Sequence, residues 1–433
     1  MKHVEQIKSL VLFLLVVLSL ILTFSIWTYT PNYESIEDST VQQVKIGKQK
    51  ESIQEVLKPY RILSHQNGSF LGTGSATASK DVMDAFKGLN ATELTSMQRL
   101  SEEEINNKIH SENQMTLFFS SEVPINAFRS VFQFTQGDLY DFTFSYILVD
   151  WSNLKNKILD LSLISKENQT MYTTVVAISE EQFNSTFMKA VQQSVPYEEI
   201  ERPNELSLYV PSNPVDLFQY TYYIDEISPE TFKNVLFKDT NLVRKNIESN
   251  SYTDGTAMMT PDSRKKTISY VYPQSDSIFE IPEIEPSELL QDSYDFINQH
   301  GGLTGDYRYN YSNVANRYIE YQLFLHGLPV YSSSISTRIA ITWGDNQVFE
   351  YTRPYYLFGI SVSNPWQLPS GPEIIDTIEN LDDIEELVLG YYLTPDSPES
   401  KVYSLEPSWF AIRDGNPVPL TTKPVGGAQY GLE

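Results

Sequence analysis

Residues 317–351 read RYIEYQLFLHGLPVYSSSISTRIAITWGDNQVFEY, and this stretch decides the fold class of the C-terminal third of the chain. β-Branched and aromatic residues dominate it, and two turn-forming sequences interrupt it, His326-Gly-Leu-Pro329 and Gly344-Asp-Asn346. Apolar and aromatic runs bounded by Gly, Pro and Asn are typical of strands joined by tight turns. The stretch therefore predicts an antiparallel meander with strands at 317–326, 329–336, 337–343 and 347–351.

Helical segments are expected on both sides of this meander. Residues 287–299 repeat apolar side chains at the spacing of one helix face, and Gly301 follows as a stop signal. In residues 373–389, isoleucine and leucine alternate with carboxylates at helical spacing, which predicts a second helix whose acidic face is solvated. With a strand at 402–412, these elements make a C-terminal domain of helices and antiparallel sheet, residues 284–433.

Two further α+β units are expected before this domain. In residues 30–200, helical patterns precede a series of strands, and Ser101 and Glu104 have the spacing of a capping box. Residues 201–204 are expected to be a linker, and residues 205–283 combine strands with a short helix as a middle domain.

The N-terminus contains one long uncharged segment. No charged residue occurs from Ser9 to Tyr33, and residues 10–27 are apolar apart from three hydroxyl side chains. About 20 helical residues at ~1.5 Å each span the roughly 30 Å hydrocarbon layer of a bilayer. A cleaved signal peptide is the alternative, but this apolar run is longer than a usual signal core and no small-residue cleavage site follows it. We therefore expect a cytoplasmic arm at 1–8 and an uncleaved signal-anchor, a transmembrane helix, at 9–29.

Flanking residues predict the orientation of this helix. Lys2 and Lys8 precede it, whereas three carboxylates follow it within residues 34–38, so the positive-inside rule places the N-terminus in the cytoplasm. Trp27 and Tyr29 suit the outer interface of the lipid bilayer. The expected fold class is therefore α+β: a single N-terminal transmembrane helix followed by a multi-domain extracellular part of helices and mainly antiparallel sheets.

One face of the predicted anchor carries candidates for contact with a partner helix. Leu12, Val16, Ser19, Thr23 and Ile26 recur three or four residues apart. In lipid, helices associate through packing and through hydrogen bonds from small polar residues. The alternative is that the two hydroxyl groups bond only the carbonyl groups of their own helix.

Composition excludes several classes of protein. The chain has 433 residues with 31 Lys and Arg against 56 Asp and Glu, a formal charge of −25, which repels the phosphate backbone of nucleic acids. It has no cysteine, which excludes disulfides, thiolate metal sites, a cysteine nucleophile and lipoprotein acylation. A large extracellular part without cysteine fits the surface of a Gram-positive bacterium.

No sequence motif for catalysis, a metal or a cofactor stands out. None of the five histidines has the spacing of a zinc site, and we expect them to be solvated polar residues: His3, His65, His110, His300 and His326. The acidic residues of 373–399 lack the spacing and the turn glycine of a calcium loop. Tyrosine-rich residues 307–311 and 351–356 resemble a sugar platform, but alternating tyrosine is also typical of strands. The sequence therefore predicts neither an enzyme nor a cofactor.

Several fragments, in order along nearly the whole chain, resemble the YycH family of membrane-anchored extracytoplasmic regulators of the WalK (YycG) sensor histidine kinase. They lie in residues 8–33, 252–256, 321–331 and 405–409. The motif positions that carry the resemblance outside the anchor are Tyr252, Asp254, Gly255, Gly327, Pro329, Pro407 and Trp409.

This resemblance implies a non-enzymatic regulator of a two-component system that controls cell-wall metabolism. Its implied partners are the sensor kinase, contacted through the transmembrane helix, and a companion regulator, YycI, which the C-terminal domain is expected to resemble. The resemblance implies no catalytic residue. Two alternatives stay open: an extracytoplasmic peptide-binding or protease-inhibitory module that uses a sheet edge, and a cell-wall carbohydrate binder.

Overall fold

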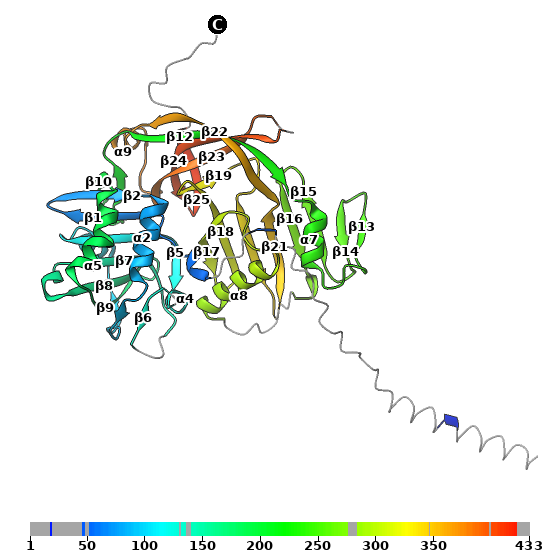
Figure 1. The fold of residues 1–433 in the computed structure, drawn as a ribbon, viewed down its shortest axis with the longest axis horizontal. Helices are drawn as coiled ribbons and strands as arrows, with labels where there is room; N and C mark the ends of the chain where they lie inside the picture. The colour runs from blue at the N-terminus through cyan, green and yellow to red at the C-terminus, as the bar shows by residue number, and fades with distance from the viewer. Residues whose placement is uncertain are drawn as a thin grey trace, which may run out of the picture. The chain divides into compact units, whose positions relative to one another are not determined.

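The protein is described here by a computed structural model of residues 18–19, 46–47, 52–129, 131–135, 140–275, 284–345, 347–397 and 400–421. The chain divides into two compact units, Met1–Gln43 and Val44–Glu433. In the second unit, every described strand belongs to one of two large sheets, one built from the first half of the unit and one from the second (Figure 1).

Almost all of the predicted anchor lies outside the described residues. This holds for the arm and interface residues Lys2, Lys8, Trp27 and Tyr29, and for the contact candidates Leu12, Val16, Thr23 and Ile26. Ser19 is described, in a helical stretch with Leu18. Within the described ranges, no helix has both the length and the apolar character needed to cross a membrane.

The first sheet has 11 strands among the described residues, in the order β11-β10-β2-β1-β5-β7-β8-β9-β3-β6, with β4 beside β9. Neighbouring strands are antiparallel except for β3 and β6. The strands are β1 (Arg61–Gln66), β2 (Ser69–Thr73), β3 (Asn90–Ala91), β4 (Gln98–Arg99), β5 (Gln114–Pro124), β6 (Gln133–Phe134), β7 (Thr143–Asp150), β8 (Ile158–Ser165), β9 (Thr170–Ala177), β10 (Val195–Ile200) and β11 (Leu208–Pro211).

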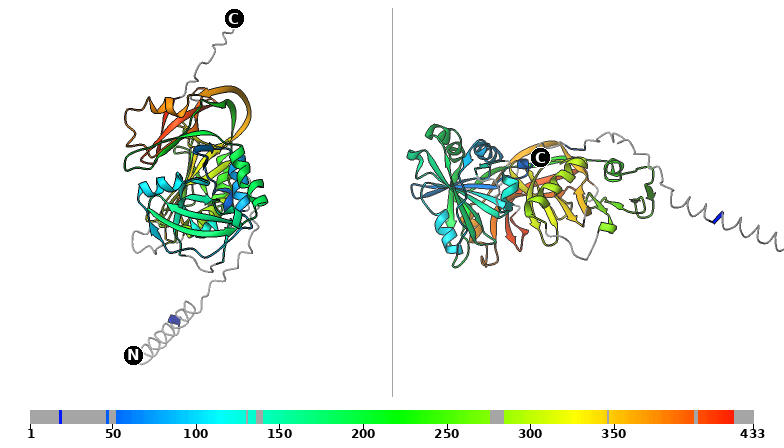
Figure 2. Two further views of the ribbon diagram at one scale, coloured as in Figure 1. Left: turned by 90° about the vertical axis from the view of Figure 1, so that its left-hand side faces the viewer. Right: turned by 90° about the horizontal axis from the view of Figure 1, so that it is seen from below.

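Helices cover both faces of this sheet, which explains why β5 and β7 are apolar on both sides (Figure 2). Leu117 and Ile147 face the cluster that contains α2 and α6, whereas Phe118 and Leu148 face the cluster that contains α3. The helical segments here are η1 (Ile53–Glu55), α2 (Ala76–Phe86), α3 (Glu102–Ile109), α4 (Ile125–Phe128), η2 (Leu154–Asn156), α5 (Glu180–Ser185) and α6 (Phe187–Gln192).

The predicted capping box at the start of α3 is confirmed. The Ser101 side chain accepts a hydrogen bond from Glu104 N at 3.2 Å, and the Glu104 carboxylate accepts one from Ser101 N at 2.7 Å. Two of the amide groups that a helix start leaves without partners are thereby satisfied.

The second sheet has 14 strands among the described residues, in the order β13-β14-β15-β16-β21-β20-β18-β19-β23-β24-β12-β22, with β17 beside β18 and β25 beside β24. The four strands expected in the meander are present as β18, β19, β20 and β21, but the expected pairing of each strand with the next is wrong. β18 lies between β19 and β20, and β19 pairs on its other side with β23 in parallel. The strands are β12 (Val215–Glu226), β13 (Arg244–Asn246), β14 (Ser251–Thr253), β15 (Met258–Asp262), β16 (Thr267–Val271), β17 (Asp306–Asn313), β18 (Tyr318–Leu325), β19 (Leu328–Tyr331), β20 (Arg338–Trp343), β21 (Val348–Pro354), β22 (Tyr356–Leu368), β23 (Glu386–Pro395), β24 (Val402–Arg413) and β25 (Asn416–Thr421).

The helix expected before the meander is α8, Pro286–Gln299. Its buried Leu290 and Ile297 belong to the same core cluster as Ile319 and Ile341 of the meander, and Trp343 Nε1 donates a hydrogen bond to Ser293 Oγ at 2.8 Å. The other helical segments of this half are short: α7 (Pro229–Leu236), η3 (Pro273–Ser275) and α9 (Gly371–Ile375).

The long helix expected at residues 373–389 is wrong. Helix α9 ends at Ile375, residues 376–385 form turns, and the rest of the range enters strand β23. The guanidinium group of Arg202 donates hydrogen bonds to the carbonyl groups of Leu381 and Ile384, at 2.9 and 2.6 Å. Arg202 lies 179 and 182 residues before these two partners, and it satisfies carbonyl groups that a helix would have used internally. The helical periodicity of the segment could not reveal such a distant partner.

Arg202 also belongs to the expected linker, 201–204. That segment connects β10 to β11, and these two strands pair with each other in the first sheet. Strand β16 pairs with β21, so residues before and after 283 share the second sheet. The division of the chain into domains at 30–200, 205–283 and 284–433 stays a prediction.

The β14–β15 hairpin depends on the carboxylate of Asp254. This group accepts hydrogen bonds from Thr256 N, Thr256 Oγ1 and Ala257 N at 2.8 to 2.9 Å, and Gly255 takes the positive φ that the turn requires. Burial acts to raise the pKa of Asp254, but these hydrogen bonds outweigh it, so the pKa lies below its usual value.

We expect Asp254→Ala to lower the free energy of unfolding by about 1 kcal/mol at pH 7, because the turn loses its acceptor. A depressed pKa stabilises the folded state above the unfolded value of about 3.9, and this contribution is lost as the pH falls through the folded pKa. Urea unfolding of the full chain in detergent from pH 7 to pH 3 measures it, with Asp254→Asn as the control that keeps one acceptor oxygen. A deficit that grew toward acid would contradict the prediction.

Candidate functional site

A pocket lies where the two sheets meet. Its cavity volume is about 210 Å³, and its walls come from the first sheet, the start of α2 and the strands of the second sheet around β23. Its lining includes Arg61, Tyr197, Tyr209, Leu328, Pro329 and Trp409. Because both sheets contribute walls, a shift of one sheet against the other would change the shape of this pocket.

Two of the seven motif positions identified from the sequence meet in this pocket. Pro329 of β19 and Trp409 of β24 line it, and Gly327 forms the preceding turn with φ of 89°. A side chain at Gly327 would also meet Ala76 N at 2.9 Å, so this turn lies directly against the start of α2. Pro407 is buried in β24 opposite Tyr391.

The other three motif positions, Tyr252, Asp254 and Gly255, form the β14–β15 hairpin and are absent from the pocket lining. Tyr252 is buried and donates a hydrogen bond to Glu230 Oε1 at 3.0 Å, which ties the hairpin to α7.

A buried ion pair joins the two sheets beside the pocket. Arg61 of β1 donates hydrogen bonds to both carboxylate oxygens of Glu386 in β23, at 3.1 and 3.0 Å. Tyr60 donates a third hydrogen bond to the same carboxylate at 2.7 Å. Such a two-pronged contact fixes orientation as well as distance, so it sets how β1 and β23 lie relative to each other.

The residues around Arg61 fix the position of its guanidinium group and keep it protonated. Its guanidinium group donates to Tyr209 O at 3.0 Å and lies 4.3 Å from the centre of the Phe118 ring. Burial acts to lower the pKa of Arg61, but the neighbouring Glu386 more than compensates and the pKa is raised. Burial, followed by the same carboxylate, raises the pKa of Tyr60 well above its usual value. Both groups therefore keep their protons at physiological pH.

Trp409 forms the apolar wall of the pocket. It is 1% exposed and packs in a cluster with Leu208 and Val210 of β11 and Leu387 of β23. Its Nε1 donates a hydrogen bond to Pro369 O at 2.9 Å. The indole therefore holds β11, β23 and the segment before α9 together.

His326 lies at the rim of the pocket, in the turn between β18 and β19. Its ring stacks on Tyr220 with centroids 4.0 Å apart, and its Nε2 shares a hydrogen bond of 2.9 Å with Tyr222 OH. Burial lowers the pKa of His326, which favours a neutral imidazole. The side chain of His326 is exposed, as expected from the sequence, yet it has specific partners. The same expectation is wrong for His65, which is only 5% exposed and stacks on Phe70 with ring centroids 4.3 Å apart.

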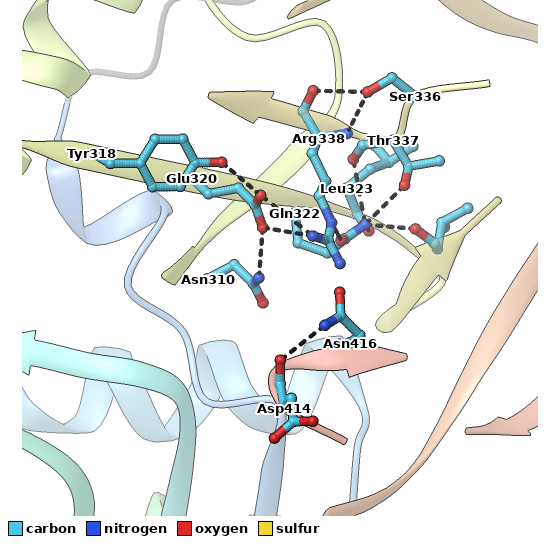
Figure 3. Close-up of polar contacts among 11 residues, drawn as sticks. Asn310, Tyr318, Glu320, Gln322, Leu323, Ser336, Thr337, Arg338, Asp414 and Asn416 are labelled. Atoms are coloured by element: carbon cyan, nitrogen blue, oxygen red, sulfur yellow. Dashed lines mark hydrogen bonds and ion pairs between the residues drawn. The ribbon is translucent and has the colours of Figure 1, made fainter. Parts of the chain in front are cut away.

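A polar network around β18 and β20 of the second sheet positions β19 (Figure 3). Glu320 of β18 accepts hydrogen bonds from Asn310 and Tyr318, each at 3.0 Å, and forms an ion pair with Arg338 at 3.2 Å. Arg338 Nε donates a hydrogen bond to Gln322 Oε1 at 3.0 Å. Arg338 therefore connects the side chains of Glu320 and Gln322.

Gln322 connects this hydrogen-bonded network to β19. The side chain is fully buried, and its Nε2 donates to Val330 O at 2.5 Å and to Thr337 Oγ1 at 3.2 Å. Strand β19 in turn pairs in parallel with β23, the strand of Glu386. Figure 3 also shows the Asn416 amide, from the start of β25, pointing toward Arg338.

Burial raises the pKa of two carboxyl groups, Glu122 and Asp292, but neither lines the pocket. Within the described ranges, no group of three His, Cys, Asp or Glu residues is placed to hold a metal ion.

Sequence reasoning did not identify Arg61 or Glu386. Glu386 was expected on the solvated face of a helix, but its side chain is only 14% exposed and it lies in a strand. The partners are 325 residues apart, and no local pattern relates two such positions. The one local signal was Arg61 itself, a charged residue immediately before the apolar run of β1.

Comparisons with known proteins match the whole architecture. Residues 5–196 match the family model described as YycH protein, N-terminal domain, and residues 205–425 match YycH protein, C-terminal domain. The curated Two-component system WalR/WalK regulatory protein YycH of Bacillus subtilis (strain 168) is 23% identical over 461 aligned positions, covering 99% of each chain.

A solved structure shares the fold. The crystal structure of YycH from Bacillus subtilis superposes with a TM-score of 0.71 at 19% identity, covering 87% of this chain and 99% of that chain. The C-terminal model alone spans half of the sequence, and together the two models cover nearly all of it. This chain belongs to the YycH family.

Proposed function

We propose that this protein regulates a two-component system of the WalR/WalK kind by contacting its membrane sensor histidine kinase. The observation that carries the proposal is the similarity, over 99% of both chains, to a protein named as a regulator of that system. The match includes the N-terminal residues from position 5 onward, which contain the predicted anchor. The proposal therefore includes a single-pass location, with the N-terminus cytoplasmic and the rest of the chain outside the cell.

A regulator of this kind needs no reactive group, but it must contact one signalling state of the kinase more favourably than the other. A partner that binds one state of a kinase more tightly shifts the equilibrium by that difference, typically about 1–3 kcal/mol. In our proposal the transmembrane helix makes the contact, and the extracellular part, with a YycI-like companion, sets the position of the helix.

The sheet junction supports this proposal. The pair of Arg61 and Glu386, together with Trp409, links the first sheet to the second through buried contacts. Linked sheets move together, so a partner bound on the second sheet can act on the first, which follows the anchor in the chain. The geometry favours this transmission over a catalytic role because the junction contains positioning groups.

We expect Ser19→Leu with Thr23→Leu to weaken co-purification of the kinase from detergent-solubilised membranes by roughly tenfold, equivalent to about 1.4 kcal/mol. The two hydroxyl groups are replaced by side chains that cannot hydrogen-bond across helices. The melting temperature of the extracellular part should not change. Co-purification followed by immunoblotting measures the first effect, and thermal unfolding of the same samples measures the second.

The matched control is Ser25→Leu with Thr28→Leu, which removes the same two kinds of hydroxyl group from the opposite side of the predicted helix. An equal loss of kinase co-purification in both double variants would show that binding depends on the hydroxyl groups of the helix in general and not on one face. Unchanged co-purification in the first variant would remove this face of the helix from the proposal.

A further inference from the structure

The end of the second sheet at β13 has a charge opposite to that of the rest of the chain. Residues 231–266, which include most of α7 and strands β13 to β15, contain seven Lys and Arg but only four Asp and Glu. This part therefore carries a formal charge of +3, whereas the rest of the chain carries −28. Figure 1 shows α7, β13 and β14 together at this end of the sheet, and β13 is its outermost strand.

The outer edge of this region combines basic and aliphatic side chains. Lys238, Arg244 and Lys245 are exposed. In the described ranges, the ion pairs of this region are made by other lysines, so these three charges have no carboxylate partner. Leu242 and Ile247 lie among them in the sequence and are 62% and 88% exposed. We call these five residues the basic edge.

The chain enters its second compact unit near the same end of the sheet. Gly47 N donates a hydrogen bond to Gly301 O at 2.8 Å. The next residue, Gly302, accepts a hydrogen bond from Arg353 at 2.9 Å, and this guanidinium group lies 5.2 Å from the centre of the buried Phe232 ring of α7. The point of entry is therefore connected to α7 through a single side chain.

We propose that the basic edge contacts the anionic phospholipid surface of the membrane that holds the predicted anchor. This inference rests on the single-pass location in the proposed function. Residues 30–45 connect the predicted anchor to the point of entry and span at most about 55 Å, so the second unit stays near the lipid surface.

Charge selects this edge among the surfaces of the molecule. Lys and Arg are attracted to anionic headgroups, and aliphatic side chains between them enter the headgroup layer. The −28 of the rest of the chain is repelled by the same surface, so the field of the lipid turns the basic edge toward it.

Size favours lipid over an acidic protein as the occupant of the basic edge. Three basic and two aliphatic side chains cover far less than the roughly 1,200–2,000 Å² that a specific protein interface buries. An anchored chain needs no such area, because the anchor keeps the basic edge at a high local concentration beside the lipid. The contact holds the second sheet in one orientation relative to the membrane.

The absence of cysteine allows a single introduced label to report this contact. The full chain with Ile247→Cys carries an environment-sensitive fluorophore and is reconstituted in nanodiscs of phosphatidylglycerol and phosphatidylcholine, with a headgroup spin-labelled lipid as the quencher. The control label is Ile360→Cys, an equally exposed isoleucine (86%) in β22, the last strand in the sheet order. We expect quenching at position 247 to exceed that at position 360 by about threefold or more.

The quenching should depend on charge. Nanodiscs of phosphatidylcholine alone should reduce quenching at position 247 to the level at position 360. So should about 1 M sodium chloride, which shortens the screening length to about 3 Å and leaves the sequence unchanged. The triple variant Lys238→Glu with Arg244→Glu and Lys245→Glu should have the same effect. A matched control makes the same change of charge at three exposed lysines of the first half of the unit and should leave the quenching unchanged: Lys80→Glu, Lys155→Glu and Lys157→Glu.

Equal quenching at positions 247 and 360 in nanodiscs that retain the chain would overturn the lipid contact and leave the proposed function standing. Quenching at position 247 that persists in phosphatidylcholine alone would overturn the role of charge. Release of the chain from the nanodiscs on gel filtration would overturn both the contact and the single-pass location. Weaker kinase co-purification in the basic-edge triple variant, without a quenching difference between the labels, would overturn the lipid contact and assign the basic edge to an acidic protein surface.

Discussion

Arg61→Met is expected to lower the free energy of unfolding by roughly 3–5 kcal/mol, because it leaves the Glu386 carboxylate buried without its counter-ion. Methionine keeps much of the apolar volume that packs on Phe118 and removes the charge and its hydrogen bonds. Tyr209 O would lose its guanidinium donor as well. Urea unfolding of the full chain in detergent measures the change.

A double-mutant cycle separates the ion pair from other effects. Glu386→Leu alone leaves Arg61 buried and unpaired, and the combination with Arg61→Met removes both charges at once. We expect the double variant to be more stable than either single variant, with a coupling energy of about 1–3 kcal/mol. Strictly additive effects would mean that the pair contributes nothing through its own contact.

Trp409→Ala is expected to be nearly as damaging, at about 3–5 kcal/mol, because it opens a cavity where β11, β23 and the segment before α9 meet. The same change enlarges the pocket between the sheets, since the indole forms one of its walls. Thermal and urea unfolding measure the loss, and limited proteolysis of residues 201–207 should report loosening of the first sheet from the second.

Trp409→Phe is the control for this prediction. Phenylalanine keeps an aromatic ring in the cluster but cannot donate to Pro369 O, so we expect a smaller loss of about 1–2 kcal/mol. A melting curve for Trp409→Ala that overlays that of the unchanged protein would show that the sheets are held together without this contact.

The elements that sequence predicted well have local causes. The strands of residues 317–351, though not their order in the sheet, follow from alternating apolar residues and turn signals within a few positions of each other. The capping box of Ser101 and Glu104 is contained within four residues, and α8 shows its apolar face over four turns. For these segments, the secondary-structure propensity, the spacing of apolar residues and the observed burial all indicate the same element, so tertiary packing did not override the local preference.

The segment after α9 shows where this reasoning reached its limit. Its isoleucines and leucines recur at helical spacing, and Ile384 and Leu387 are indeed buried. However, Ile384 lies in a turn and Leu387 in a strand, and neither lies in a helix. Arg202 donates hydrogen bonds to carbonyl groups of the turn, and β24 pairs with the strand. Short apolar runs are compatible with either structure until a partner is known.

Membership of one family, an α+β fold and the strands of the meander could be inferred from sequence because each rests on neighbouring residues or on their order along the chain. The contact between Arg61 and Glu386 and the wall formed by Trp409 became known only from the tertiary structure. Each joins segments that are far apart in the chain. Folding selects such pairings because they give the whole chain the most favourable total of apolar burial and hydrogen bonding. This total cannot be calculated from a short stretch of sequence.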